Sequence, residues 1–197
     1  MKIDILFLDN DLSDHEEYFD NQTIKEYCET HSFEGEKNQI LSVPPSYSKS
    51  QNLTFLVGLG ENKVDNNFYD IGTLIGSKIK SDAEIKFLNF EEEKNLIIDG
   101  ILYVQYKFNN YKSEDDSSIN NITFKDIDSS VNEIKKDSVF WVRDLINTPA
   151  LDKSPEEFID KVKELVDSSD IDVEVYDKKW LEENNFGGVL GLSLIHI

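Results

Sequence analysis

Two short apolar runs constrain the fold of this chain more than any other feature. Residues 3–8 (IDILFL) and 53–57 (LTFLV) are nearly continuous in apolar side chains, and each is closed by turn-forming residues, Asp-Asn-Asp after the first and Gly-Leu-Gly after the second. Such runs suit strands that are buried on both faces, as in parallel sheets covered by helices. The sequence therefore predicts at least two strands inside a helix-covered sheet.

Further strands and helices follow from the spacing of apolar residues. Residues 109–121 are polar and predict a surface loop at the tip of a hairpin, and residues 10–38 show only weak helical spacing. The other expected elements are helices at 68–79, 96–106, 131–146 and 178–185, strands at 84–88, 122–124, 171–175 and 188–192, and a left-handed helix stop at Gly187-Gly188.

The clearest helix start lies near residue 154. Ser154 is an N-cap residue, Pro155 occupies the first helical position, and Glu157 completes a capping box. The helix before it ends at Asn147-Thr148-Pro149, since proline disfavours a helical residue in front of it. The sequence thus predicts a break between two helices here.

The order of these elements predicts an α/β fold, because strands and helices alternate and parallel pairing is expected. The length of 197 residues fits one domain, or one domain and part of another. The polar segment 126–130 marks the expected boundary between two parts of the chain. We expect residues 1–128 to form an independent α/β domain, and residues 129–197 to form a linker helix and the incomplete start of a second α/β domain.

Charge and composition exclude several classes of function. The net charge is -20, and Arg143 is the single arginine, which argues against phosphate contacts with nucleic acid and against anionic membranes. No run approaches the ~18 apolar residues of a spanning helix, and Met1–Ile5 lacks the pattern of a secretory signal. Cys28 is the single cysteine, so no internal disulfide can form. A soluble, cytoplasmic protein is expected.

No catalytic constellation is visible from the residues alone. The histidines have no metal-ligand spacing, Cys28 has no supporting histidine, and the acidic pairs lie in polar loops that favour solvation over acid–base chemistry. The sequence predicts no catalytic, cofactor-binding or metal-binding residue in this chain. The residues considered are His15, His31, His196, Cys28, Asp9, Asp11, Asp115 and Asp116.

Two features leave alternatives open. The pair Gly58-x-Gly60 follows a strand, but Lys63 stands where a dinucleotide fingerprint needs its third glycine, so a strand-end turn with positive φ is favoured. Arg143 could anchor a carboxylate network, although an ion pair that holds two helices together is the favoured interpretation.

Four blocks of sequence resemble the leucyl (cytosol) aminopeptidase family in order and spacing. The third block matches the family's R-D-L-x-N-x-P pattern followed by S/T-P-E, and the others match V-G-L-G, E-G-x-x-L-x-x-Y-x-F-x-x-Y-K and G-G-x-L-G-V. The blocks are Phe55–Gly60, Asp99–Lys112, Trp141–Ala150 with Ser154–Glu156, and Phe186–Gly191.

The resemblance implies a metal-dependent peptidase with an N-terminal domain of macro-domain-like fold. In this family two divalent metal ions (Mn or Zn) act in hydrolysis of the N-terminal peptide bond of a peptide substrate. One ion polarises the carbonyl, and both lower the pKa of a bridging water. The family enzyme is a homo-hexamer, so the resemblance implies a homo-hexamer for the full-length protein.

The match departs from the family pattern after Gly191. Family members continue with G-x-G-S and then supply the lysine and carboxylate ligands, whereas residues 192–197 read LSLIHI, which resembles adapter read-through. No ligand can be carried over, so we expect a truncated gene model and a chain that binds no metal and has no peptidase activity by itself. The alternatives are a nucleotide or ADP-ribose binding module, with Gly58–Gly60 and Gly72–Gly76 as its cradle, and an oligomerisation domain.

Overall fold

The computed structural model describes residues 1–10, 17–19, 21–61, 67–90, 93–111, 120–167 and 169–193. Contacts divide the chain into two compact units, Met1–Asp144 and Leu145–Ile197. The first unit contains the five-stranded sheet and extends past residue 128. The expected division into folding domains after that residue stays a prediction.

The sheet of the first unit is mixed, with strand order β2-β3-β1-β4-β5. β1 lies at its centre and pairs in parallel with β3 and β4, β5 pairs in parallel with β4, and the edge strand β2 is antiparallel to β3. This arrangement confirms the α/β class. The strand bounds are β1 Lys2–Leu8, β2 Ile40–Val43, β3 Leu53–Gly58, β4 Ala83–Phe87 and β5 Ile122–Phe124.

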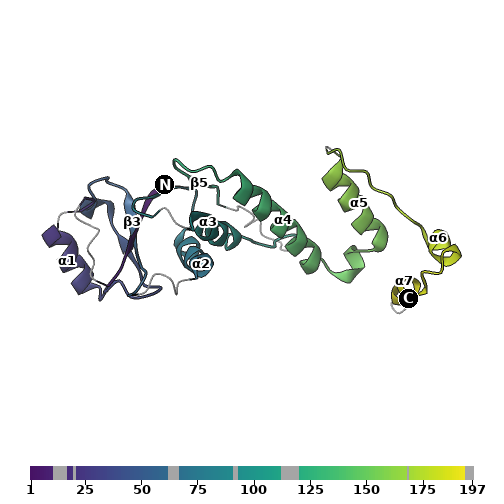
Figure 1. Ribbon diagram of the computed structural model, residues 1–197, viewed down its shortest axis with the longest axis horizontal. Helices are drawn as coiled ribbons and strands as arrows, with labels where there is room; N and C mark the ends of the chain where they lie inside the picture. Colours follow the sequence, from purple (N-terminus) through teal and green to yellow (C-terminus); the bar gives the residue numbers. More distant parts are fainter. Residues whose placement is uncertain are drawn as a thin grey trace. The chain divides into compact units, whose positions relative to one another are not determined.

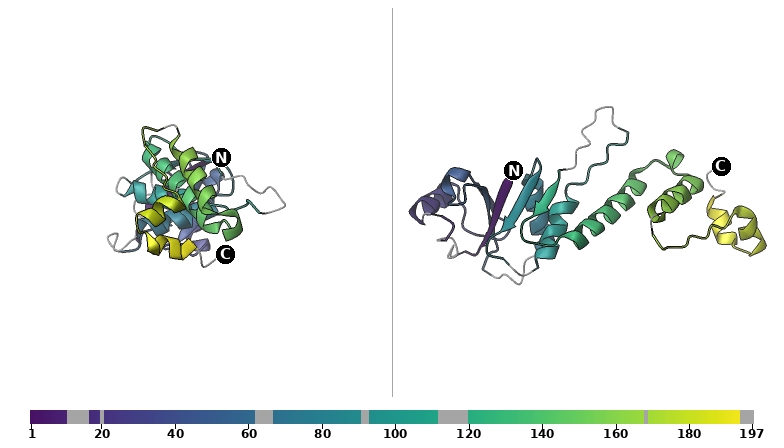
Figure 2. Two further views of the ribbon diagram at one scale, coloured as in Figure 1. Left: turned by 90° about the vertical axis from the view of Figure 1, so that its right-hand side faces the viewer. Right: turned by 90° about the horizontal axis from the view of Figure 1, so that it is seen from above.

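Helices lie on both sides of this sheet, which explains the apolar runs. Figures 1 and 2 show α1 (Asn21–Thr30) on one side of the strands and α2 (Phe68–Lys78) with α3 (Lys94–Tyr103) on the other. Ile5 of β1 packs in the core toward α2 and α3, and Leu6 packs in the core beneath α1. Alternate side chains of β1 are thus buried in opposite directions.

Glycines allow α2 and α3 to approach closely. A Cβ atom at Gly72 would overlap the carbonyl oxygen of Ile97, and one at Gly100 would overlap the carbonyl oxygen of Tyr69. Gly76 likewise faces the backbone of Ile101. The small residues on the expected helix face therefore serve the packing of one helix against the other.

Several predicted elements are corrected in the first unit. Strand β5 is not the second arm of a hairpin: it joins β4 in parallel after the α3 crossover, which places it at the edge of the sheet. Helix α1 lies within residues 10–38, where the sequence indicated little helix. Its buried residues Ile24 and Cys28 are four positions apart, so too few apolar residues mark the helix for its period to stand out.

The regular elements among the described residues of the second unit are all helices. The unit contains a short 3-10 helix at Ala150–Asp152, followed by α5 (Pro155–Val166), α6 (Lys178–Glu183) and α7 (Gly187–Ser193). The capping box at the start of α5 is confirmed, since the Ser154 hydroxyl accepts from the Glu157 amide at 3.2 Å and the Glu157 carboxylate accepts from the Ser154 amide at 2.9 Å.

Two predicted strands of this unit are wrong. Residues 171–175 pair with no strand among the described residues, and residues 188–192 fall in helix α7. A strand needs a neighbour to pair its backbone groups, and a local helix satisfies them without one. Gly187 starts α7 rather than stopping α6, and Asn185, with φ of 63°, takes the left-handed position.

Candidate functional site

A buried polar network fastens helix α4 (Ser130–Asn147) to α3. The Asn132 side-chain amide donates to the Asp99 carboxylate at 2.6 Å and to the Asn95 carbonyl at 3.0 Å. The Lys135 ammonium lies 3.4 Å from the other Asp99 oxygen. Asn132 and Asp99 are only 2% and 7% exposed, so these bonds satisfy groups that water cannot reach.

Arg143 and Asp144 fasten the same helix near the end of α3. The Arg143 guanidinium carbon lies 4.0 Å from the centre of the Tyr106 ring, and one of its nitrogens donates to the Tyr103 carbonyl at 3.3 Å. The Tyr106 hydroxyl donates to the Asp144 carboxylate at 2.8 Å, and its ring meets Phe140 edge-on.

These contacts decide between the two interpretations of Arg143. The predicted role of holding two helices together is confirmed, but the predicted ion pair is wrong, because no ion pair of Arg143 occurs in the described parts of the chain. The guanidinium instead uses an aromatic face and a carbonyl in the last turn of α3, where a positive charge is favourable.

The apolar positions predicted on this helix point mostly outward. Val131, Ile134, Val142 and Ile146 are exposed, whereas Asn132 and Phe140 are buried. Asn132 can be buried because Asp99 and Asn95 complete its hydrogen bonds. The amphipathic pattern located the helix correctly, but it did not identify the side of the helix that packs against α3.

The other residues singled out from the sequence do not assemble into a site. His31 is exposed, stacks on Tyr27 and contacts the Tyr27 carbonyl through Nδ1 at 2.8 Å. Cys28 is 4% exposed and belongs to the core beneath α1, and this burial, followed by the charge of Glu29, raises the pKa of its thiol to about 11. Asp9 follows β1. The remaining residues lie outside the described parts: His15, His196, Asp11, Asp115 and Asp116.

The glycine positions are accounted for by the backbone. Gly60 has φ of +71°, which confirms the strand-end turn. Gly58 lies against the backbone of Gly35 and Glu36, and Gly72 and Gly76 are covered by α3. None of Gly58, Gly72 and Gly76 therefore presents open backbone to a ligand.

A two-metal centre does not fit the residues that the structure describes. Over those residues, no group of three or more His, Cys, Asp or Glu side chains could hold a metal ion. In the same residues, no helix is long and apolar enough to cross a membrane.

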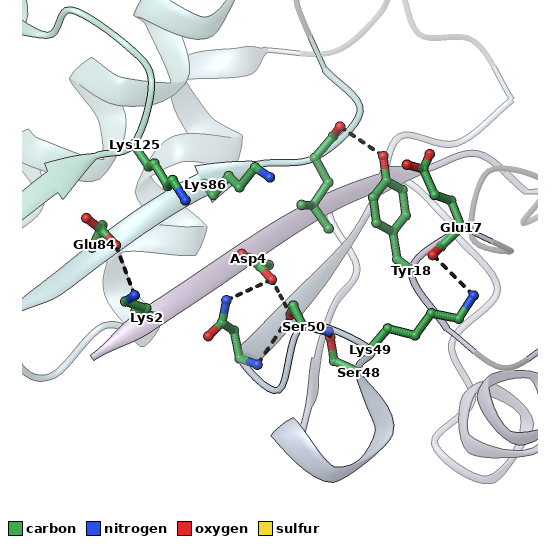
Figure 3. A pocket seen from close by; sticks show the side chains of 12 residues that line it. Lys2, Asp4, Glu17, Tyr18, Ser48, Lys49, Ser50, Glu84, Lys86 and Lys125 are labelled. Carbon is green, nitrogen blue, oxygen red and sulfur yellow. Dashed lines mark hydrogen bonds and ion pairs between the residues drawn. The ribbon is translucent and has the colours of Figure 1, made fainter.

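A polar pocket opens on the side of the sheet that α1 covers only in part (Figure 3). It has a volume of about 450 Å³, and Asp4, Ser50 and Asn52 form a hydrogen-bonded group in it. Sequence reasoning missed this site, although the signal was present, since Asp4 is the single charged residue within the run 3–8. Its lining residues are Lys2, Asp4, Glu17, Tyr18, Ser48, Lys49, Ser50, Asn52, Glu84, Lys86, Leu88 and Lys125.

Comparison with known proteins gives a consistent class. The model of the cytosol aminopeptidase family, catalytic domain, matches residues 140–193. A probable cytosol aminopeptidase of Rhodococcus opacus (strain B4) is 45% identical over 57 residues, which are 29% of this chain and 11% of that protein. Its counterpart in Clostridium tetani (strain Massachusetts / E88) is 25% identical over 183 residues, 82% of this chain and 37% of that protein.

Solved structures show the same fold. A mutant of tomato leucine aminopeptidase matches with a TM-score of 0.69 at 16% identity, over 92% of this chain and 43% of that chain. The bottromycin maturation enzyme BotP in complex with Mn matches with a TM-score of 0.67 at 14% identity, over 92% and 39%.

The class defined by these matches is a peptidase fold of the leucine aminopeptidase type. Over residues 140–193 the chain is similar to the cytosol aminopeptidase family, and it spans between about a tenth and two fifths of the length of the curated relatives it matches.

Proposed function

We propose that this chain is part of a metal-dependent aminopeptidase that removes N-terminal amino acids from peptides. The observation that carries the proposal is the match of residues 140–193 to the catalytic-domain model of the family. The match begins at Phe140, within the part of α4 that packs against α3.

The first unit, in this proposal, serves as the support for α4. Asn132 and Arg143 bind α3 at positions three turns apart along α4, so the helix is held at two places. Two separated attachments fix the direction of a helix better than one. The segment that matches the family's catalytic domain begins within α4, so a fixed helix would fix the position of its first residues.

The chemistry of the whole enzyme would come from two divalent metal ions, Mn or Zn, which polarise the scissile carbonyl and generate a nucleophilic water. Since the described residues do not fit such a centre, we place the metal ligands outside them and assign no chemical step to this chain. The whole protein would act on peptides in the cytoplasm as a homo-hexamer, and the 197-residue chain alone would be inactive.

Two measurements test this proposal. Genomic sequencing downstream of codon 191 should show a frame that continues into Gly-x-Gly-Ser and later lysine and carboxylate ligands, and a stop codon after Ile197 would contradict it. The purified 197-residue chain should hydrolyse no leucine amide with Mn²⁺ or Zn²⁺ added. Metal-dependent hydrolysis that EDTA abolishes would contradict the inactivity of the chain alone.

The alternative function, an assembly module, makes a different prediction. An oligomerisation domain would self-associate at low micromolar concentration, and sedimentation velocity of the 197-residue chain would detect it. A monomer at all concentrations would exclude assembly by this chain alone and would leave the peptidase proposal untouched.

A further inference from the structure

The pocket around Asp4 lies apart from the residues that fasten α4. It lies along the strands β1 and β4, which supply Lys2, Asp4, Glu84 and Lys86, and the loop before β3 supplies its other wall (Figure 3). Its volume of about 450 Å³ falls within the range of sites for small molecules. Nothing in the proposed peptidase function uses it.

Asp4 is held in one orientation by neutral donors. The Ser50 hydroxyl donates to Oδ2 at 2.5 Å, the Asn52 side-chain amide donates to the same oxygen at 3.2 Å, and the Ser48 and Ser50 hydroxyls lie 2.8 Å apart. The Asp4 residue is 2% exposed and forms no ion pair with a described lysine or arginine. A buried carboxylate with these partners still has acceptor capacity on its second oxygen.

Four lysines surround this carboxylate in a protein with twice as many acids as bases. The Lys2 ammonium lies 4.0 Å from the Glu84 carboxylate, and the Lys49 ammonium donates to the Glu17 carbonyl at 3.2 Å. Among the described residues, the ammonium groups of Lys86 and Lys125 have neither a hydrogen-bond nor an ion-pair partner. The pocket therefore offers two unpaired ammonium groups and, besides the exposed carboxylates of Glu17 and Glu84, one buried carboxylate oxygen of Asp4.

We propose that this pocket binds a small phosphorylated sugar, with the phosphate toward Lys86 and Lys125 and a sugar hydroxyl toward Asp4. A phosphate dianion matches two ammonium groups in charge, and lysine is a common phosphate ligand. A carboxylate that accepts from a ribose hydroxyl is a recurrent way of recognising this sugar. A bare anion would leave Asp4 opposed to it, and a cation would be repelled by the lysines.

Isothermal titration calorimetry with three probes separates the parts of this proposal. Ribose 5-phosphate should bind the 197-residue chain in low salt. Inorganic phosphate should bind about tenfold more weakly because it lacks the hydroxyl contact with Asp4, and ribose should not bind detectably because it lacks the charge that attracts the lysines. Affinity for ribose 5-phosphate should fall as salt is raised, because the lysines are exposed.

Variants test the placement. K86A/K125A should weaken the binding of ribose 5-phosphate at least tenfold. The matched control K78A/K80A removes two lysines that lie outside the pocket, and it should leave the affinity unchanged. D4N should remove the advantage of ribose 5-phosphate over phosphate. A circular dichroism melt of each variant establishes that it is folded, and K86A/K125A changes only side chains at the pocket edge.

Several results would overturn the proposal. Binding that survives in K86A/K125A, or that falls equally in K78A/K80A, would mean a general charge effect. Equal affinity for phosphate and ribose 5-phosphate would remove the role of Asp4. Glutamate is titrated as a fourth probe, and tighter binding of glutamate than of ribose 5-phosphate would contradict the proposed ligand. The absence of heat with every probe at concentrations on the order of 10 mM would rule out the site. None of these results bears on the peptidase proposal.

Discussion

Arg143 covers one face of the Tyr106 ring at 4.0 Å, while the hydroxyl of the same ring donates to Asp144, the next residue of α4. One tyrosine is thus bound by two consecutive residues of the helix. This relationship gives the R-D pair of the family's R-D-L-x-N-x-P block a structural role in this chain. Measurements of stability can test this role without an assay of enzymatic activity.

Removing the guanidinium should weaken this attachment measurably. We expect R143A to lower the free energy of unfolding by about 1 kcal/mol, since a cation–π contact at an exposed site contributes about 0.5–1 kcal/mol. R143K should retain part of this, because lysine keeps the charge without the planar group. Urea denaturation measures both. In the Y106A background the effect of R143A should be smaller, because only the hydrogen bond to the Tyr103 carbonyl then remains. Independent, additive effects in this double-mutant cycle would contradict the contact.

The Asn132 network should contribute more, because it is buried. N132A leaves the Asp99 carboxylate without its closest donor, and such a loss costs about 1–3 kcal/mol. The control is V131A, at a residue of the same helix that is 62% exposed, which should change stability by under about 0.5 kcal/mol. If both variants unfold at the same urea concentration, the network does not stabilise α4.

Close packing of α2 on α3 predicts a large effect at Gly72. G72A should force the two helices apart and destabilise the first unit by about 3 kcal/mol or more, through the overlap with the Ile97 carbonyl. G188A is the control, since no atom lies within 4 Å of a Cβ at that position in α7. It should stabilise that helix by up to about 1 kcal/mol, because alanine favours helix over glycine. Thermal melts that rank the two variants the other way would contradict this packing.

Burial of Cys28 predicts a loss of stability at alkaline pH. The pKa of the thiol rises from 9.0 to about 11 in the folded chain, so folding favours the neutral thiol. The stability that this shift contributes is present below pH 9.0 and is lost as pH rises toward about 11. Urea titrations across this range should show a shallower decline for C28A than for the parent. Parallel declines would mean that other groups, such as tyrosines, control the effect.

Rapid reaction of the native thiol with a disulfide reagent at pH 8 would also contradict this burial. The residue is 4% exposed, so the reagent should react only after local opening. Addition of urea should accelerate the reaction in step with unfolding.

Local chemistry was sufficient to predict much of this molecule. The runs 3–8 and 53–57 became strands because helices cover both sides of them, as continuous apolar runs require. The α5 capping box formed as predicted, because all its partners lie within four residues. The turn at Gly60 has the same origin.

Tertiary structure decided what depends on distant partners. Residues 171–175 alternate like a strand, yet a strand forms only beside another strand, and no strand of the described residues pairs with them. Asn132 is buried although it is polar, since Asp99 and Asn95 lie on another helix. Asp4, Lys86 and Lys125 come from separate segments and meet only in the fold. The sequence by itself determined the elements whose partners lie within a few residues, such as the α5 cap and the Gly60 turn, whereas strand pairing and burial follow from contacts between segments far apart in the chain.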